Sequence, residues 1–164
     1  MSQVAAIAPF AAPPEDALPP GAGLRVHEPA EKVGGGSGVM KVLLLEDDPA
    51  FKEIMKDFLS ENGFAVVAVQ NGVEGVHEVL ASDFEVILCD MMMPTLPGDM
   101  FFRAVERMRP HLCQRFIFMT GHRNNSKVNE FISNVCGTIL CKPFHGDDLL
   151  EMIAFVRVRT LLAA

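Results

Sequence analysis

The chain contains no tryptophan and no tyrosine, and its 164 residues include 14 basic residues against 21 acidic ones. The net charge of −7 argues against binding a nucleic-acid backbone by charge alone. Because Trp and Tyr are missing, bases could stack only on phenylalanine. No run of about 18 apolar residues occurs, so the sequence predicts no membrane-spanning helix. We therefore expect no direct nucleic-acid partner and no membrane association.

Cysteine is also scarce, with four residues at positions 89, 113, 136 and 141. No two of them form Cys-x-x-Cys, and no histidine stands at zinc-finger spacing. Cys89 and Cys141 lie in apolar runs, which predicts that both are buried in strands. We expect reduced thiols and a cytoplasmic protein.

Proline and glycine are concentrated at the start of the chain, where residues 1–39 hold six of the 11 prolines and six of the 13 glycines. This composition predicts a disordered tail that ends in a flexible linker at Gly34–Gly38. It is no signal peptide, because Val4–Ala12 follows no basic residue and Pro9 interrupts it. The tail is either a natural low-complexity linker or a peptide tethered to the domain. The predicted domain then covers 40–160, and 161–164 form its C-terminal end.

From residue 40 onward, short apolar runs alternate with helical periodicity. The predicted strands are Lys41–Leu45, Phe64–Val69, Phe84–Cys89, Arg115–Thr120 and Thr138–Cys141. The predicted helices are 49–61, Asn71–Ala81, Gly98–Met108, Ser126–Asn134 and Asp147–Arg159. In the first helix Phe51, Ile54, Met55, Phe58 and Leu59 recur at helical spacing, and in the second Val73, Val76, Val79 and Leu80 are predicted to face inward.

Strands that read as continuous apolar runs are buried on both faces, which indicates a parallel sheet between two helix layers. Right-handed crossovers limit such a chain to a doubly wound α/β fold, here with five βα units. In open sheets of this kind the ligand site lies outside the carboxyl ends of the strands. The residues that end each strand are therefore the candidates for chemistry.

Charged and hydroxyl side chains stand at four of these ends: Glu46-Asp47-Asp48, Asp90, Thr120-Gly121 and Lys142. Crowded carboxylates repel one another unless one is protonated or a cation binds between them. Oxygen ligands suit Mg²⁺. A carboxylate can also attack a phosphoryl group, whose transition state a lysine, a hydroxyl and Mg²⁺ would stabilise. Asp48, one position past the pair, is expected either to face solvent or to cap a helix.

Four motifs in this order resemble the receiver domain of two-component response regulators, the CheY-like superfamily. They are Val42-Leu-Leu-Leu-Glu-Asp-Asp-Pro49, Val86-Ile-Leu-Cys-Asp-Met-Met-Met-Pro94, Phe116-Ile-Phe-Met-Thr-Gly121 and Lys142-Pro-Phe144. The resemblance covers about three quarters of the chain. It implies a flavodoxin-like sheet with strand order 2-1-3-4-5 and a cis Lys142-Pro143 bond.

The resemblance also implies a role for each motif residue. Asp90 is the expected phosphoacceptor and Mg²⁺ ligand, Asp47 a second ligand, Glu46 a ligand through water, and the backbone carbonyl of Met92 a further ligand. Thr120 and Lys142 are expected to bind the phosphoryl oxygens, and Gly121 avoids crowding them. Such a domain catalyses its own phosphorylation and slow dephosphorylation but is not a turnover enzyme.

Three positions bear on how this sequence departs from the receiver pattern that it resembles. Ile139 stands where receivers commonly place Tyr or Phe, so Phe116, Phe118, Phe131 or smaller shifts would have to report phosphorylation. Met92 and His122 flank the phosphoryl group and are expected to tune its lifetime. We predict that Met92 shields the group from water, and that His122 faces solvent.

The implied partners are a sensor histidine kinase or a histidine phosphotransfer protein, and a downstream protein that binds the surface of helix 4, strand 5 and helix 5. Two alternatives remain open at this point. A pseudo-receiver would bind partners without phosphorylation, as the missing aromatic at Ile139 would allow. A dehalogenase-like phosphatase would need Asp-x-Asp after the first strand, and Glu46-Asp47-Asp48 lacks that spacing.

Overall fold

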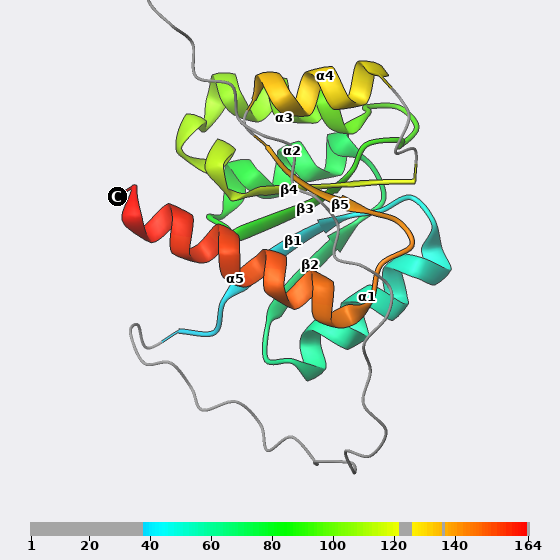
Figure 1. Ribbon diagram of the computed structural model, residues 1–164, viewed down its shortest axis with the longest axis vertical. Coiled ribbons are helices and arrows are strands. Elements are labelled where there is room, and N and C mark those ends of the chain that lie inside the picture. Colours follow the sequence, from blue (N-terminus) through cyan, green and yellow to red (C-terminus); the bar gives the residue numbers. More distant parts are fainter. Residues whose placement is uncertain (1–37, 122–125, 136, 164) are drawn as a thin grey trace, which may run out of the picture. The chain divides into compact units, whose positions relative to one another are not determined.

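The computed structural model describes residues 38–121, 126–135 and 137–163, in which five strands alternate with five α-helices (Figure 1). The strands are β1 (Lys41–Leu45), β2 (Ala65–Val69), β3 (Val86–Asp90), β4 (Phe116–Thr120) and β5 (Thr138–Cys141). The helices are α1 (Pro49–Glu61), α2 (Gly72–Ala81), α3 (Gly98–Met108), α4 (Ser126–Asn134) and α5 (Gly146–Leu162), and a 3₁₀-helix, η1 (Pro110–Arg115), precedes β4. The predictions about the N-terminal tail, His122 and Cys136 lie outside the described residues.

The sheet is parallel throughout and its strand order is β2-β1-β3-β4-β5, which confirms the predicted fold class. β1 and β3 are neighbours at the centre, with Leu45 paired to Cys89. Asp90 pairs with Met119, and Thr120 pairs with Cys141. The carboxyl ends of β3, β4 and β5 are therefore level with one another, and the polar residues that end them meet at one edge of the sheet.

Helices cover both faces of the sheet, with α2, α3 and α4 on one side and α1 and α5 on the other (Figure 1). The core is divided in the same way. One cluster joins the sheet to Val79, Phe101, Val105 and Ile132 of the first group of helices, and the second joins it to residues such as Leu59 and Ile153 of α1 and α5. Burial of the strands on both faces explains why they read as unbroken apolar runs.

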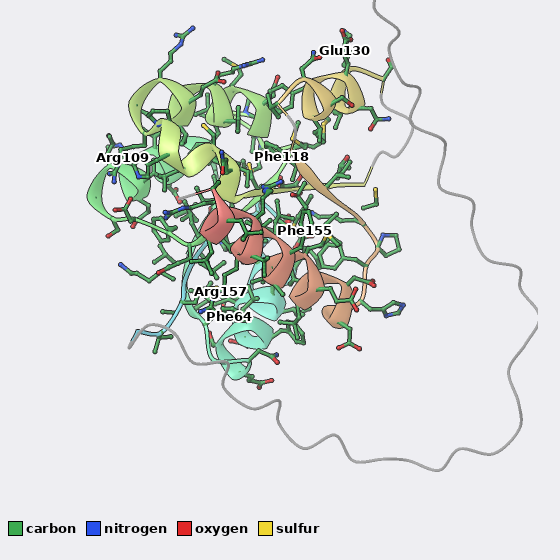
Figure 2. The ribbon with its side chains drawn as sticks, turned by 60° about the vertical axis from the view of Figure 1, so that its left-hand side comes forward. Phe64, Arg109, Phe118, Glu130, Phe155 and Arg157 are labelled. Carbon is green, nitrogen blue, oxygen red and sulfur yellow. The ribbon has the colours of Figure 1, made fainter. Side chains whose placement is uncertain are left out.

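Phenylalanine rings form most of the core on the α3–α4 side. Phe102 lies 5.0 Å from Phe116, 5.6 Å from Phe118 and 5.7 Å from Phe131, measured between ring centroids. Phe118 is fully buried, and Figure 2 shows it inside the domain, with Glu130 on the outer side of α4. Edge-to-face pairs of this kind add to the stabilisation that area burial provides. Phe116 and Phe118 are thus packed core residues, and Phe131 is half-buried.

Local signals fix both ends of α1 as the sequence predicts, whereas α5 ends at Leu162, beyond the predicted Arg159. The Asp48 carboxylate caps α1 by accepting the N–H groups of Ala50 (2.9 Å) and Phe51 (3.0 Å). Pro49 follows in the first turn, where its missing N–H leaves no bond unmade. α1 ends before Gly63, whose φ of 86° is costly for residues with a side chain. Asp48, expected either to face solvent or to cap a helix, is exposed and caps α1.

Three apolar residues on the predicted apolar faces of the first two helices are instead exposed. Ile54 is 66% exposed, Val73 44% and Leu80 54%. A helix that packs on one sheet face buries only one stripe, which Met55 and Leu59 occupy in α1 and Val79 in α2. Cys141 is half-buried rather than buried, because β5 is an edge strand. Among the described residues, no helix is long and apolar enough to cross a membrane.

Candidate phosphoryl-transfer site

The site lies at the carboxyl edge of the sheet, where four strands deliver polar residues. Glu46 and Asp47 follow β1, Asp90 ends β3, Thr120 ends β4 and Lys142 follows β5. The strand register places all of them at one edge, although almost 100 positions separate Glu46 from Lys142. The parallel topology is therefore what assembles the group.

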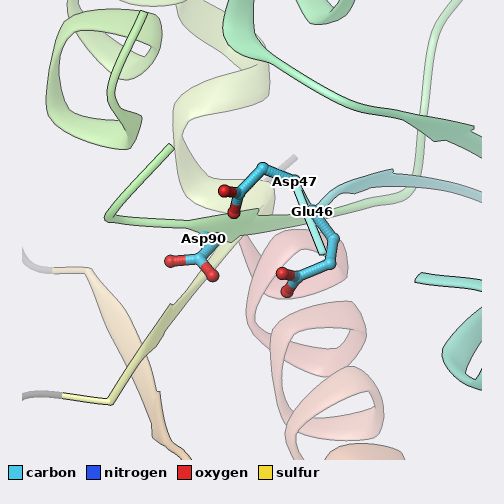
Figure 3. A group of neighbouring side chains, drawn as sticks. All are labelled: Glu46, Asp47 and Asp90. Carbon is cyan, nitrogen blue, oxygen red and sulfur yellow. The ribbon is translucent and has the colours of Figure 1, made fainter. Parts of the chain in front are cut away.

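Three carboxylates form the acidic part of this site (Figure 3). Glu46, Asp47 and Asp90 each offer an oxygen atom, and these atoms all lie within 4.8 Å of one another. Glu46 and Asp90 are buried, whereas Asp47 is exposed to solvent. Hard oxygen ligands of this number, with one side open to water, suit a hydrated Mg²⁺ ion. The donor set therefore fits the Mg²⁺ ion that the sequence resemblance implies.

Lys142 supplies the positive charge that faces these carboxylates. Its Nζ donates to Oε2 of Glu46 at 2.7 Å and to Oδ2 of Asp90 at 2.5 Å. Its backbone N–H donates to the carbonyl oxygen of Thr120 at 2.8 Å, which ties the lysine to the end of β4. Burial alone would lower the pKa of Lys142, but the hydrogen bonds to Asp90 and Glu46 outweigh it and the net pKa is raised. The lysine therefore stays charged.

The surroundings of Glu46 shift its pKa. Burial raises its pKa above the ordinary value, in spite of the opposing hydrogen bond and charge of Lys142. The negative charge of Asp90 acts in the same direction as burial. Oε1 of Glu46 accepts the N–H of Asp48 at 3.2 Å, so both of its oxygens have protein partners. Protein donors thus hold both oxygens of Glu46 in place, and a nearby cation would favour its ionised form.

The β3–α3 loop fixes the other oxygen of Asp90. The N–H of Met92 donates to Oδ1 of Asp90 at 2.8 Å, and the Met92 side chain is 54% exposed. Met91 and Met93, on either side, are buried in the core. At Gly98 an added Cβ would lie 2.5 Å from the carbonyl oxygen of Asp90, so only glycine lets α3 begin so close to the loop.

Thr120 and Ile139 differ in their surroundings. Thr120 is fully buried, and a Cβ added to the neighbouring Gly121 would meet no atom of the described residues within 4 Å. Ile139 pairs with Phe118 in the sheet and its side chain is 37% exposed on β5. Ile139 lies at the surface of the edge strand β5, which Lys142 follows in the sequence.

An aromatic contact that sequence reasoning did not identify completes the site. The Nζ of Lys142 lies over the ring of Phe51, 4.8 Å from its centroid. Phe51 and Phe144 meet edge to face at 5.9 Å. These rings, with Pro143 and three charged residues, line a surface cavity of about 440 Å³. Helical periodicity marked Phe51 only as an apolar residue of α1, and no spacing signal links it to Lys142.

Comparison with known proteins agrees with this geometry. The family model described as the response regulator receiver domain matches residues 42–154, which is more than half of the chain. The chain therefore belongs to the response regulator receiver domain family. It is 30% identical to the chemotaxis protein CheY of Bacillus subtilis over 113 residues, which are 68% of this chain and 92% of CheY. The Lys142-Pro143 bond is cis, as the family resemblance implied.

Solved structures show the same fold. A CheY-like receiver domain protein from Methanospirillum hungatei superposes with a TM-score of 0.71 at 23% identity, over 77% of this chain and all of that one. The receiver domain of the sensor histidine kinase PA1611 of Pseudomonas aeruginosa, whose active-site cleft coordinates a magnesium ion, gives 0.63 at 22% identity, over 71% of this chain and 95% of that one.

Several other curated relatives are much longer than the part that matches. The chain spans 20% of one fungal transcription factor and 50% of a bacterial transcriptional activator. In those proteins the receiver is one part of a larger regulator. Receiver domains as a class belong to two-component systems, interact with histidine kinases and downstream effectors, and are not turnover enzymes.

Proposed function

We propose that this receiver domain is phosphorylated on Asp90 by a phosphohistidine of a sensor kinase or phosphotransfer protein, and that it signals through contact with another protein. The observation that carries the proposal is the position of Lys142 Nζ, within hydrogen-bond distance of both Asp90 and Glu46. A buried carboxylate pair facing one lysine, with a third carboxylate open to solvent, is the set of charges that phosphoryl transfer to an aspartate requires.

In this proposal an oxygen of Asp90 attacks phosphorus as the phosphorus–nitrogen bond to histidine breaks. The bonding electrons leave with the imidazole, and the product is an acyl phosphate. The N–H of Met92 holds Oδ1 of Asp90 and fixes the carboxylate plane. Lys142, already at Oδ2, is placed to donate to an oxygen of the arriving group. Thr120 and Gly121 lie at the same edge of the sheet and would receive the remaining oxygens.

Asp47, Asp90, the backbone carbonyl of Met92 and Glu46 through a water molecule would hold Mg²⁺. When bound, the ion would neutralise the carboxylates and the negative charge that develops on the phosphoryl oxygens. The magnesium site described for the PA1611 receiver, on the same fold, supports this choice of metal. Exposed apolar residues on α5 and β5, which include Phe155 (Figure 2) and Ile139, support an output surface on that side.

Binding of beryllofluoride, which mimics an aspartyl phosphate, tests the proposal. Because the chain has no tryptophan, binding should be followed by two-dimensional NMR or calorimetry with Mg²⁺ present. We expect saturable binding by the wild type, loss of binding in Asp90→Asn, and unchanged binding in Asp57→Asn, a matched change at an exposed position of α1. If the folded wild-type protein bound no beryllofluoride at millimolar concentration, the pseudo-receiver suggested by Ile139 would replace this proposal.

A further inference from the structure

Four residues around the acidic cluster form a closed ring of contacts. Oε1 of Glu46 accepts the N–H of Asp48 at 3.2 Å, and Oδ1 of Asp48 accepts the N–H of Phe51 at 3.0 Å. The ring of Phe51 lies under Lys142 Nζ, 4.8 Å from the centroid. Lys142 completes this closed set of contacts, because its Nζ donates to Oε2 of Glu46 at 2.7 Å. The position of each member therefore depends on the next.

Lys142 has charged partners on one side and an aromatic face on the other. A lysine side chain is a flexible four-carbon stem that ends in a strongly hydrated ammonium group, and it favours solvent unless it is held. Only 23% of the Lys142 side chain is exposed. The face of an aromatic ring attracts a cation electrostatically, and more strongly where water is excluded. Phe51 therefore stabilises the inward orientation of the ammonium group.

Phe51 is itself fixed from two directions. The Asp48 cap sets the first turn of α1, from which the ring projects. Phe144, two positions after Lys142, packs edge to face against the ring at 5.9 Å with an angle of 64° between the planes. The ring thus touches both the ammonium group and the loop that carries it. It also forms part of the wall of the 440 Å³ cavity that Lys142, Pro143 and Phe144 line, so removing it would open the lysine to water.

We propose that Phe51 is a positioning residue, whose ring holds the Lys142 ammonium group against Asp90 so that the lysine is in place before a phosphoryl group arrives. The inference rests on the proposed function, in which Lys142 binds that group. It adds that α1 contributes to phosphoryl binding through an apolar side chain. Leucine, which fills similar space but has no π-face, would pack in the cavity and leave the ammonium group free to turn toward solvent.

NMR of the unphosphorylated protein tests the contact without any phosphorylation. Protons near an aromatic face are shifted by the ring current, so the Lys142 side-chain methylene resonances of the wild type should be displaced from ordinary lysine positions. Phe51→Leu should return them to those positions, and Phe51→Tyr should keep the displacement. Phe58→Leu, the same change at another half-buried position of α1, should leave them unchanged. Ordinary lysine shifts in the wild type would overturn the proposal.

Beryllofluoride binding in the presence of Mg²⁺ tests the consequence. We expect Phe51→Leu to weaken binding about fivefold, Phe51→Tyr to restore it to within about twofold of the wild type, and Phe58→Leu to stay within about twofold. Equal affinity of Phe51→Leu and the wild type would overturn the positioning role. Equal losses in Phe51→Leu and Phe58→Leu would do the same, because they would show a general effect of packing in α1. Failure of the wild type to bind would instead contradict the proposed function, while the NMR shifts would still report on the contact.

Discussion

The ammonium nitrogen of Lys142 lies 2.5 Å from Oδ2 of Asp90, although 52 positions separate the two residues in the chain. The pair is mostly buried, with 23% of the lysine and 9% of the aspartate side chain exposed. A second carboxylate, that of Glu46, shares the lysine. Two carboxyl groups therefore share one ammonium group.

Replacing Lys142 by methionine should destabilise the domain, because it leaves two buried carboxylates without a cation. We expect the free energy of unfolding to fall by about 1–3 kcal/mol, less than for a fully buried pair because part of the lysine is exposed. Adding Mg²⁺ should recover part of the loss. Denaturant unfolding measures both effects. Lys56→Met, which breaks an exposed pair with Glu53, should cost at most about 0.5 kcal/mol. Equal losses in the two variants would contradict the prediction.

The raised pKa of Glu46 should make stability depend on pH in a defined direction. The pKa of Glu46 is raised above the ordinary value of 4.5. At pH values just above that value, such a carboxyl group binds more protons in the folded protein than in the unfolded one. Its contribution is therefore most favourable at low pH and is lost as pH rises through the folded pKa. Without Mg²⁺, the unfolding free energy of the wild type minus that of Glu46→Gln should decrease from pH 4 toward neutrality. A difference that grew with pH would show the opposite shift.

Two glycines at the site should respond differently to alanine. At Gly98 the new Cβ would lie 2.5 Å from the carbonyl oxygen of Asp90, so the backbone at the end of β3 must move. We expect Gly98→Ala to lower the unfolding free energy by about 1–3 kcal/mol. At Gly121 the Cβ meets no atom of the described residues within 4 Å, so Gly121→Ala should change stability by less than about 0.5 kcal/mol and should weaken only beryllofluoride binding. A stability loss at Gly121 equal to that at Gly98 would refute this contrast.

The cysteines should differ in reactivity with their depth. Burial, together with the nearby charge of Asp90, raises the pKa of the Cys89 thiol well above its ordinary value, and the side chain is fully buried. Thiolate is the reactive form, so Cys89 should be alkylated much more slowly than the half-buried Cys141 in the folded protein. Peptide mapping by mass spectrometry after timed labelling at neutral pH would measure the two rates. Equal labelling under native conditions would contradict the prediction, and equal labelling in denaturant is the control.

Much of the architecture was predictable because the topology of a doubly wound fold is reflected in the sequence pattern of its strands. Strands buried on both faces, such as Phe116–Thr120, must be apolar throughout, and the polar residue that follows each one marks the sheet edge. The bounds of α4 and β5 agree with the predicted ranges. Prediction was weaker on helix faces. The apolar pattern of α1 contains Ile54, and only packing on the sheet decides that Met55 is buried and Ile54 is exposed.

The sequence alone determined the fold class and the strand ends that carry acidic, hydroxyl and basic residues, because each depends on local pattern or on neighbours along the chain. Only the tertiary structure decided that Lys142 contacts both Glu46 and Asp90, and that it lies over the ring of Phe51. Phe51 belongs to α1 near the start of the domain's sequence, and Lys142 follows β5 near its end. No periodicity encodes such a contact, because its geometry depends on how α1 and the loop after β5 pack on the sheet.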